Sequence, residues 1–138
     1  MPLWKIRRNL AAIVIVLWPV ACNLGFAYEE KLIGDYGLIA VDEMEQMSVC
    51  KFRNGGGGVA VINETVFAAG WNDEFLIAKQ HPNHGSIDRS VTNFYILRVT
   101  DGELFGPYTE SGYQKARQRL QLPGSLQFTR VFDRLAQM

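Results

Sequence analysis

The sequence has few cysteines, few prolines and no excess of charge, and each shortage excludes a class of protein. Two cysteines among 138 residues cannot build a disulfide-rich scaffold. Five prolines without a repeating glycine pattern exclude a collagen-like chain. Lys and Arg number 14, as do Asp and Glu, and this zero net charge argues against a dedicated nucleic-acid-binding protein. What remains is a globular balance, 48% hydrophobic and 20% charged, at a length that suits one domain.

The N-terminal segment has the pattern of an export signal. Lys5, Arg7 and Arg8 make the start of the chain basic, and residues 10–18 (LAAIVIVLW) are wholly apolar. A basic flank before an apolar run of this length is typical of a secretory signal peptide, and the basic flank stays on the cytoplasmic side. The pattern therefore predicts that residues 28–138 are exported by a bacterium. They would be periplasmic or attached to the outer side of the cytoplasmic membrane.

Three interpretations of this segment remain open. Gly25 and Ala27 are small residues where a signal peptidase requires them, so cleavage after Ala27 would release the exported part. Residues 20–22 (VAC) resemble a lipobox, which would place a lipid on Cys22. Residues 10–27 are also just long enough to remain as a membrane anchor.

Alternation and turn residues predict an antiparallel sheet in the exported part. The clearest strand is 92–100 (TNFYILRVT). Asp101-Gly102 after it is the strongest hairpin signal in the chain, and 103–105 would be a short returning strand. Residues 28–33 are expected to form a polar lead-in. The remaining expected strands are 34–42, 43–52, 59–63, 65–69 and 74–80.

The hydrophobic period changes near the C-terminus. Ser111 with Gln114 three residues later fits a helix capping box. Tyr113, Ala116 and Leu120 then share one helical face, and Pro and Gly follow them to end the helix. The pattern predicts one helix that begins at about Ser111.

The helical spacing of apolar residues in the tail predicts a second short helix from about Thr129, with a strand from Leu126 as the alternative. The expected fold class is α+β. An antiparallel sheet of five to seven strands would be followed by one or two C-terminal helices on one face. The expected organisation is a signal peptide or membrane anchor over 1–27 and a single exported domain over 28–138.

Residues 81–89 (HPNHGSIDR) carry the best candidates for metal ligands. His81, His84 and Asp88 place two imidazoles and a carboxylate in one short segment, which suits zinc. Structural zinc sites need four ligands, so the plain alternative is a solvated loop. Cys50 with His81 or His84 is a candidate nucleophile pair. Either the metal site or this pair would make the protein a small thiol- or metal-dependent hydrolase.

Trp71, Asn72 and Asp73 lie in a segment expected to be a turn. Functional residues favour exposed turns. Together with residues 81–89, these three are therefore the candidate contact surface for another envelope protein or a cell-wall component. The alternative for Trp71 is core packing, because aromatic side chains dominate core burial.

The chain carries four turn-and-strand motifs in order: residues 34–36 (GDY), 70–80 (GWNDEFLIAKQ), 93–97 (NFYIL) and 106–108 (GPY) before a helix rich in Lys and Arg. Taken together, over about residues 32–122, they resemble an uncharacterised family of small bacterial exported proteins and lipoproteins, a domain of unknown function. The resemblance implies export and a β-rich domain, and it supplies no catalytic residues.

The leading hypothesis is a non-enzymatic binding or interaction module of the cell envelope, with no cofactor and no nucleic-acid partner. One alternative is the hydrolase that would use Cys50 and the His81/His84 loop. The other is a single-pass structural protein held in the membrane by residues 10–27, or by a lipid on Cys22. The sequence favours the first because it carries an export pattern and no catalytic constellation.

Overall fold

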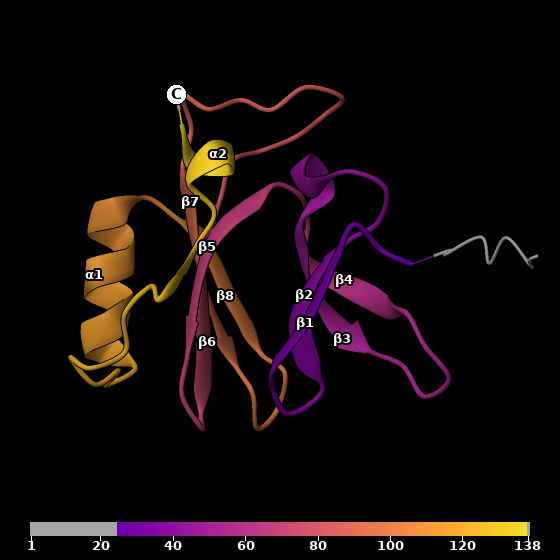
Figure 1. The fold of residues 1–138 in the computed structure, drawn as a ribbon. Helices are drawn as coiled ribbons and strands as arrows, with labels where there is room; N and C mark the ends of the chain where they lie inside the picture. The colour runs from indigo at the N-terminus through magenta and orange to yellow at the C-terminus, as the bar shows by residue number, and fades with distance from the viewer. Residues whose placement is uncertain (1–24, 138) are drawn as a thin grey trace, which may run out of the picture.

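The computed structural model describes residues 25–137, so Cys22 and nearly all of the expected signal or anchor lie outside the described residues. Within that range no helix is long and apolar enough to cross a membrane. The chain forms strands, two short α-helices and one turn of 3-10 helix (Figure 1). In chain order these are β1 (Tyr28–Ile33), β2 (Tyr36–Ala40), the 3-10 helix (Met44–Gln46), β3 (Ser48–Phe52), β4 (Gly58–Ile62), β5 (Val66–Trp71), β6 (Phe75–Gln80), β7 (Asn93–Arg98), β8 (Leu104–Tyr108), α1 (Glu110–Arg119), β9 (Arg130–Val131) and α2 (Asp133–Ala136).

The strands divide into two antiparallel sheets. The first sheet has four strands in the order β1-β2-β3-β4, and the second has five in the order β8-β7-β6-β5-β9. The expectation of one sheet with five to seven strands is corrected here, while the mostly antiparallel architecture with few helices fits the expected α+β class. The difference arises after β4, where the chain crosses to the second sheet and β5 pairs with β6. Alternation reveals a strand, and it does not reveal which strand becomes its neighbour.

The molecule has three layers, with the second sheet in the middle (Figure 1). Side chains from both sheets meet in the larger core, among them Leu38 and Val49 from the first sheet and Leu76 and Leu97 from the second. A smaller core lies between the second sheet and α1, which is anchored by Tyr113. The second sheet is thus covered on both faces, by the first sheet on one side and by α1 on the other. Within residues 25–137, no helix packs on the outer face of the first sheet.

This layering explains the sequence patterns of the middle sheet. Residues 66–70 (VFAAG) and 75–78 (FLIA) are buried without interruption. A strand with both faces covered has no polar side to present to water, so it reads as a continuous apolar run. In β6, Leu76 and Ala78 face the first sheet and Ile77 belongs to the core under α1.

Most expected strands are confirmed, and two segments are corrected. Strands lie within or close to each expected range, and the hairpin after β7 is confirmed. Residues 28–33, expected as a polar lead-in, form β1 and pair with β2. Their three charged residues, Glu29, Glu30 and Lys31, are tolerated because β1 is an edge strand. The expected strand 43–52 begins only at Ser48, since Met44–Gln46 turns as a 3-10 helix.

The first helix begins earlier than expected. Thr109 is the N-cap residue of α1, and its Oγ1 accepts a hydrogen bond from the Gly112 amide at 3.2 Å. Ser111, the expected cap, lies inside the helix. Both residues are good caps, and the fold selects Thr109. The expected helical face is confirmed, with Tyr113 and Ala116 buried.

The C-terminal tail contains both a short strand and a short helix, the two structures that the sequence left as alternatives. A helix was expected from about Thr129, but the chain first forms the two-residue strand β9 along β5, and α2 begins only at Asp133. The backbone amides of Thr129 and Phe132 donate to carbonyl oxygens of β5 at 3.0 and 2.8 Å. These bonds hold the segment extended where its apolar spacing alone predicts a helix.

The two sheets are joined along one edge by β1 and the C-terminal segment. Glu30 accepts an ion-paired hydrogen bond from Arg130 at 2.8 Å, and the rings of Tyr28 and Phe132 meet edge to face at 5.2 Å. The pair is partly exposed, so its contribution to stability is at most about 1 kcal/mol. The aromatic contact and the ion pair together close this edge of the sandwich.

Candidate functional site

Trp71, Asn72 and Asp73 lie at the turn between β5 and β6. Trp71 is the last residue of β5, and its side chain packs partly against the larger core. The guanidinium of Arg130 lies over its ring, 5.9 Å from the ring centre. Asn72 closes the turn, because its Oδ1 accepts hydrogen bonds from the amides of Glu74 and Phe75 at 2.9 and 2.8 Å. Asp73 is exposed. Asn72 therefore has a structural task in this turn, and Asp73 is the most accessible of the three.

The candidate contact surface is divided by the fold. The turn at Trp71–Asp73 precedes β6 and residues 81–89 follow it, so they lie at opposite ends of a six-residue strand. At the rise of a β-strand this separation is about 20 Å. The two groups of residues therefore do not form one continuous surface.

The three candidate metal ligands have different surroundings. His81 is buried, with 2% of its surface exposed, whereas His84 and Asp88 are exposed on the loop. The Asp88 carboxylate bonds to the hydroxyl and amide of Ser90, and these bonds lower its pKa. Within residues 25–137, no group of three His, Cys, Asp or Glu side chains is placed to hold a metal ion.

His81 instead organises the loop. Its Nδ1 lies 2.8 Å from the carbonyl oxygen of Val91, and its Nε2 lies 3.5 Å from that of Ala136 in α2. A carbonyl oxygen only accepts, so the shorter contact is assigned as a hydrogen bond that the Nδ1–H group donates to Val91. The imidazole stacks on Phe67 with ring centres 4.2 Å apart. His81 thereby connects the loop, the second sheet and the C-terminal helix.

Cys50 is a buried free thiol on the outer face of the first sheet. Burial raises its pKa to about 11. A thiolate is the nucleophilic form, so this environment disfavours nucleophilic chemistry at neutral pH. His81 follows β6 in the second sheet, and the structure does not pair it with Cys50.

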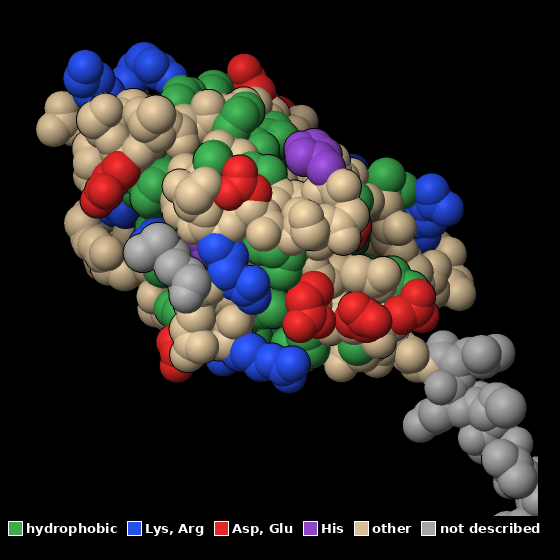
Figure 2. All heavy atoms as spheres, turned by 90° about the horizontal axis from the view of Figure 1, so that it is seen from above, with side chains coloured by type: hydrophobic (Ala, Val, Ile, Leu, Met, Phe, Trp, Pro, Cys, Tyr) green, Lys and Arg blue, Asp and Glu red, His purple; other side chains and the backbone are tan. Residues whose placement is uncertain are grey.

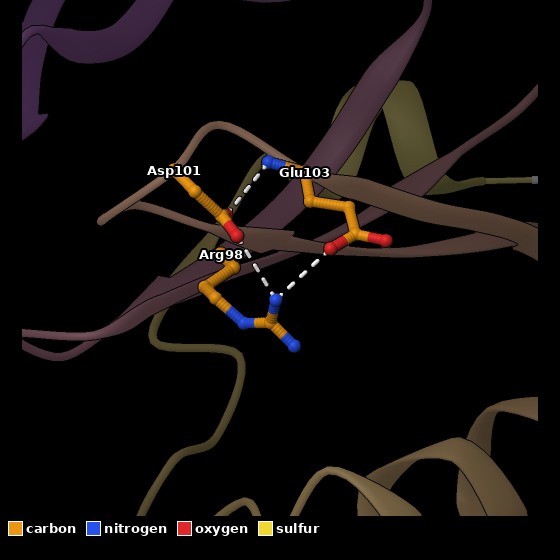
Figure 3. A network of polar contacts seen from close by, with 3 residues as sticks. All are labelled: Arg98, Asp101 and Glu103. Carbon is orange, nitrogen blue, oxygen red and sulfur yellow. Dashed lines mark hydrogen bonds and ion pairs between the residues drawn. The ribbon is translucent and has the colours of Figure 1, made fainter.

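The most connected network of charged side chains holds the β7–β8 hairpin. One guanidinium nitrogen of Arg98 lies 3.0 Å from Asp101 and 2.9 Å from Glu103 (Figure 3). The amide of Glu103 also donates to Asp101 at 3.0 Å, and both interactions lower the pKa of Asp101. These groups satisfy one another across an exposed turn, so we assign this network a structural role.

A cavity of about 450 Å³ opens at the end of the sandwich that carries the loop after β6. Its lining residues come from β5, β6, β7, the loop, the start of α1 and the end of α2, and Figure 1 shows α2 and the loop at the same end of the second sheet. A volume of this size suits a small organic ligand. Its lining residues are Phe67, Lys79, His81, Arg89, Thr92, Phe94, Thr109, Glu110 and Ala136, and we call it the basic cavity.

The two cationic side chains of the basic cavity lack carboxylate partners. Within residues 25–137, no carboxylate lies within 4.0 Å of Lys79 or Arg89. The Lys79 ammonium lies 5.4 Å from the ring centre of Phe94 and 4.7 Å from that of Phe128. Arg89 donates one long hydrogen bond, 3.5 Å, to the carbonyl oxygen of Arg134, and its Nε is buried without a partner. A buried unpaired donor costs about 1–3 kcal/mol, so an acceptor supplied here would be stabilised.

The remaining lining residues give the basic cavity an apolar wall and a polar rim. The rings of Phe67 and Phe94 form much of the wall. Thr109 and Glu110 belong to the start of α1, where backbone N–H groups favour acceptors. Figure 2 shows this end of the molecule from above, with a row of acidic side chains on one side and basic side chains elsewhere. Local charge therefore matters more here than the net charge of the chain.

The sequence placed His81 and the loop 81–89, which includes Arg89, among the candidates, but it did not single out Arg89 and it missed Lys79. Lys79 is the only charged residue in β6, a strand that is otherwise apolar apart from Gln80. A lone lysine in such a run is the signal that could have marked it. Arg89 offers no comparable signal, because an arginine in a loop is ordinary. Only the return of the chain through α1 and α2 brings these residues together.

Fold and site together define a small α+β domain with two antiparallel sheets, one covering helix and a cavity of binding-site size. The chain belongs to the family described as "Protein of unknown function (DUF3997)", whose model matches residues 33–132. The expected membership of an uncharacterised family is thus confirmed. No curated protein and no solved structure matches the chain.

Proposed function

We propose that this chain is an exported, non-enzymatic binding module of the bacterial cell envelope. Its ligand is an organic molecule that presents one carboxylate group next to an apolar body, held in the basic cavity. The observation that carries the proposal is the pair of cationic side chains, Lys79 and Arg89, in a cavity of mixed polar and apolar lining; among residues 25–137, no carboxylate lies within 4.0 Å of either.

The donors of the cavity support an anionic group. Arg89 presents a planar guanidinium fork, which matches a carboxylate with two parallel hydrogen bonds. Lys79 adds an ammonium that lies near the rings of Phe94 and Phe128. Hydrogen bonds between ionised groups are about twice as strong as neutral ones, so an anionic acceptor that reaches either side chain gains a strong hydrogen bond.

The charge of the lining supports a monoanion. Among the Lys, Arg and carboxylate side chains of the lining, Lys79 and Arg89 contribute +2 and Glu110 contributes −1, which leaves +1. A carboxylate balances this charge, whereas a phosphate monoester carries about −1.5 to −2 at neutral pH. The walls of Phe67 and Phe94 then suit an apolar body.

The ligand can be tested by calorimetry with phenylacetate as the probe, against phenylacetamide and inorganic phosphate. We expect phenylacetate to bind, and to bind more weakly as salt is added. Arg89→Gln and Lys79→Met remove the charge of each side chain while keeping part of its aliphatic stem, and each should weaken binding about tenfold or more. Arg134→Gln is the matched control, since this nearby side chain is 86% exposed and does not line the cavity.

The outcomes separate the possible ligand sources. Equal affinity for phenylacetamide and phenylacetate would overturn the assignment of a carboxylate ligand. Loss of phenylacetate binding in Arg134→Gln would show that the ligand binds outside the basic cavity. Preference for phosphate over phenylacetate would overturn the monoanion assignment. A carboxylate-bearing cell-wall peptide and a free aromatic acid, titrated in parallel, distinguish a wall component from a soluble metabolite.

Export is tested by the intact mass of the mature protein recovered from bacterial fractions. A chain that starts at Tyr28 indicates cleavage and secretion, and one that starts at Cys22 with added lipid mass indicates a lipoprotein. An uncleaved chain in the membrane fraction indicates an anchor. Recovery of the full-length chain in the cytoplasmic fraction would overturn the proposal of export.

A further inference from the structure

We infer that a second cavity, at the same end of the molecule as the basic cavity, binds an uncharged sugar unit. Its volume is about 390 Å³, and four amide side chains line it together with Tyr95 and Glu64. The four belong to Asn63, Gln80, Asn83 and Asn93, and we call it the amide cavity. The inference does not rest on the basic cavity, because the two cavities share no lining residue.

The amide cavity lies on the face of the second sheet that is turned toward the first sheet. Gln80 is the last residue of β6 and pairs with Asn93, the first residue of β7. Successive side chains of a strand point to opposite faces, and the next residue along β7, Phe94, belongs to the core under α1. Tyr95 shares the face of Asn93, and its side chain packs partly against the larger core between the sheets. The basic cavity, lined by Phe94, therefore lies on the opposite face.

Hydrogen bonds hold the amide groups in place and leave part of their capacity unused. Gln80 is only 6% exposed, and its Nε2 donates to the carbonyl oxygen of Asn63 at 2.7 Å while its Oε1 accepts from Asn93 at 3.0 Å. Among the described residues, no partner bonds to the Asn63 side chain, the Tyr95 hydroxyl or the Oδ1 of Asn93. These groups are not among the buried unpartnered atoms, so a ligand can reach them.

The wall of the amide cavity is fixed by the crossover from β4 to β5. Residues 63–65 cross at the end of the sandwich where the loop after β6 lies (Figure 1). The backbones of Thr65 and His81 exchange hydrogen bonds at 2.8 and 2.9 Å, and the side-chain amide of Asn83 donates to the Thr65 hydroxyl at 3.2 Å. The polar groups are thus pre-organised, which limits the entropy lost when a ligand binds.

The chemistry of the lining matches hydroxyl groups better than ions. A hydroxyl group both donates and accepts hydrogen bonds, as do side-chain amides and the hydroxyl of tyrosine. Among the Lys, Arg, Asp and Glu side chains, only Glu64 lines the amide cavity, and its charge opposes an anion. Pro82 and His84 complete the lining. Glycoside hydrolysis commonly uses a pair of Asp or Glu residues, and this lining has one, so the inference is binding without cleavage.

An NMR titration of the purified protein with chitotriose and cellotriose, two uncharged trisaccharides, tests the inference. We expect at least one of them to shift the side-chain amide signals of Asn63, Gln80 and Asn93, while the anionic trigalacturonate leaves these signals unchanged. Asn63→Ala and Tyr95→Phe each remove a hydrogen-bonding group and should weaken binding about fivefold. Asn54→Ala is the matched control, since Asn54 is equally exposed but does not line the cavity.

The wild-type signals locate the sugar without any substitution. Shifts confined to residues 63–64, 80–84 and 93–95 support the amide cavity, and shifts confined to other residues would overturn it. The inference also fails if neither uncharged trisaccharide shifts these signals at millimolar concentration, or if trigalacturonate shifts them equally. Equal weakening of binding in Asn63→Ala and Asn54→Ala would likewise exclude this cavity as the site.

Discussion

Replacing Gly70 with alanine should destabilise the domain for a purely steric reason. Gly70 lies in β5, and its φ is not in the left-handed region, so the backbone itself accepts alanine. A Cβ built at this position would lie 2.8 Å from the carbonyl carbon of Gln127 and closer still to its oxygen. Ordinary contact begins at 3.4 Å, so the segment between α1 and β9 would have to move by at least 0.6 Å.

That segment cannot move freely, because it is bonded to β5 directly beside Gly70. The amide of Thr129 donates to the carbonyl oxygen of Ala69 at 3.0 Å. Overpacking of this kind costs about 1–3 kcal/mol, and weakening the neighbouring hydrogen bond adds about 1 kcal/mol. The free energy of unfolding is therefore expected to fall by about 2–4 kcal/mol in Gly70→Ala. At about 4 °C per kcal/mol for a domain of this size, the melting temperature falls by about 8–16 °C.

Thermal and urea unfolding followed by circular dichroism measure this loss, and Gly124→Ala is the matched control. Gly124 also has ordinary backbone angles, but nothing lies within 4 Å of its added Cβ. Alanine there should be neutral or stabilise by up to about 1 kcal/mol, because it restricts the unfolded chain. Equal stability of the two variants would refute the packing of residues 120–129 against β5.

Three further outcomes are expected. In the folded protein, Cys50 should react slowly with a thiol reagent at pH 8 and faster as the pH approaches 11, since burial raises its pKa to about 11; rapid labelling at pH 8 without unfolding would contradict its burial. Thr109→Ala should cost about 1 kcal/mol through loss of the helix cap, whereas Ser111→Ala should cost less; urea unfolding compares the two, and the reverse order would restore Ser111 as the cap. Asn72→Ala should cost about 1–2 kcal/mol because it removes two turn hydrogen bonds, while the exposed Asp73→Ala should be nearly neutral; similar melting temperatures for these two variants would contradict the structural role of the turn.

Local patterns in the sequence were sufficient to locate most strands and the helical face of α1. Each of these depends on neighbours in the chain: the alternation of 92–100, the Asp101-Gly102 turn, and the spacing of Tyr113 and Ala116. The division into two sheets depends on pairing between distant segments, which local patterns do not encode. The strand β1 was missed for the same reason. Its charged residues look like a lead-in until the partner β2 and the edge position are known.

The site was predictable only in part. The loop after β6 was identified from its histidines, but burial and carbonyl partners assign His81 to holding that loop in place. The basic cavity joins residues from β6, the loop, α1 and α2 that are far apart in the sequence. Lys79 lies in β6 and Glu110 begins α1, and the loop, β7 and β8 lie between them in the chain. No rule of sequence spacing could therefore have placed these two residues together.

The edge formed by β1 and the C-terminal segment also sets a condition on when the chain can fold. Glu30 and Arg130 are 100 residues apart in sequence, and the Tyr28–Phe132 contact spans a similar distance. Contacts of such long range slow folding, and these form only after the last strand has been synthesised. A chain emerging from the ribosome therefore cannot close its sandwich early. If the chain is exported unfolded, as proposed above, this delay leaves time for the transport machinery to bind it first.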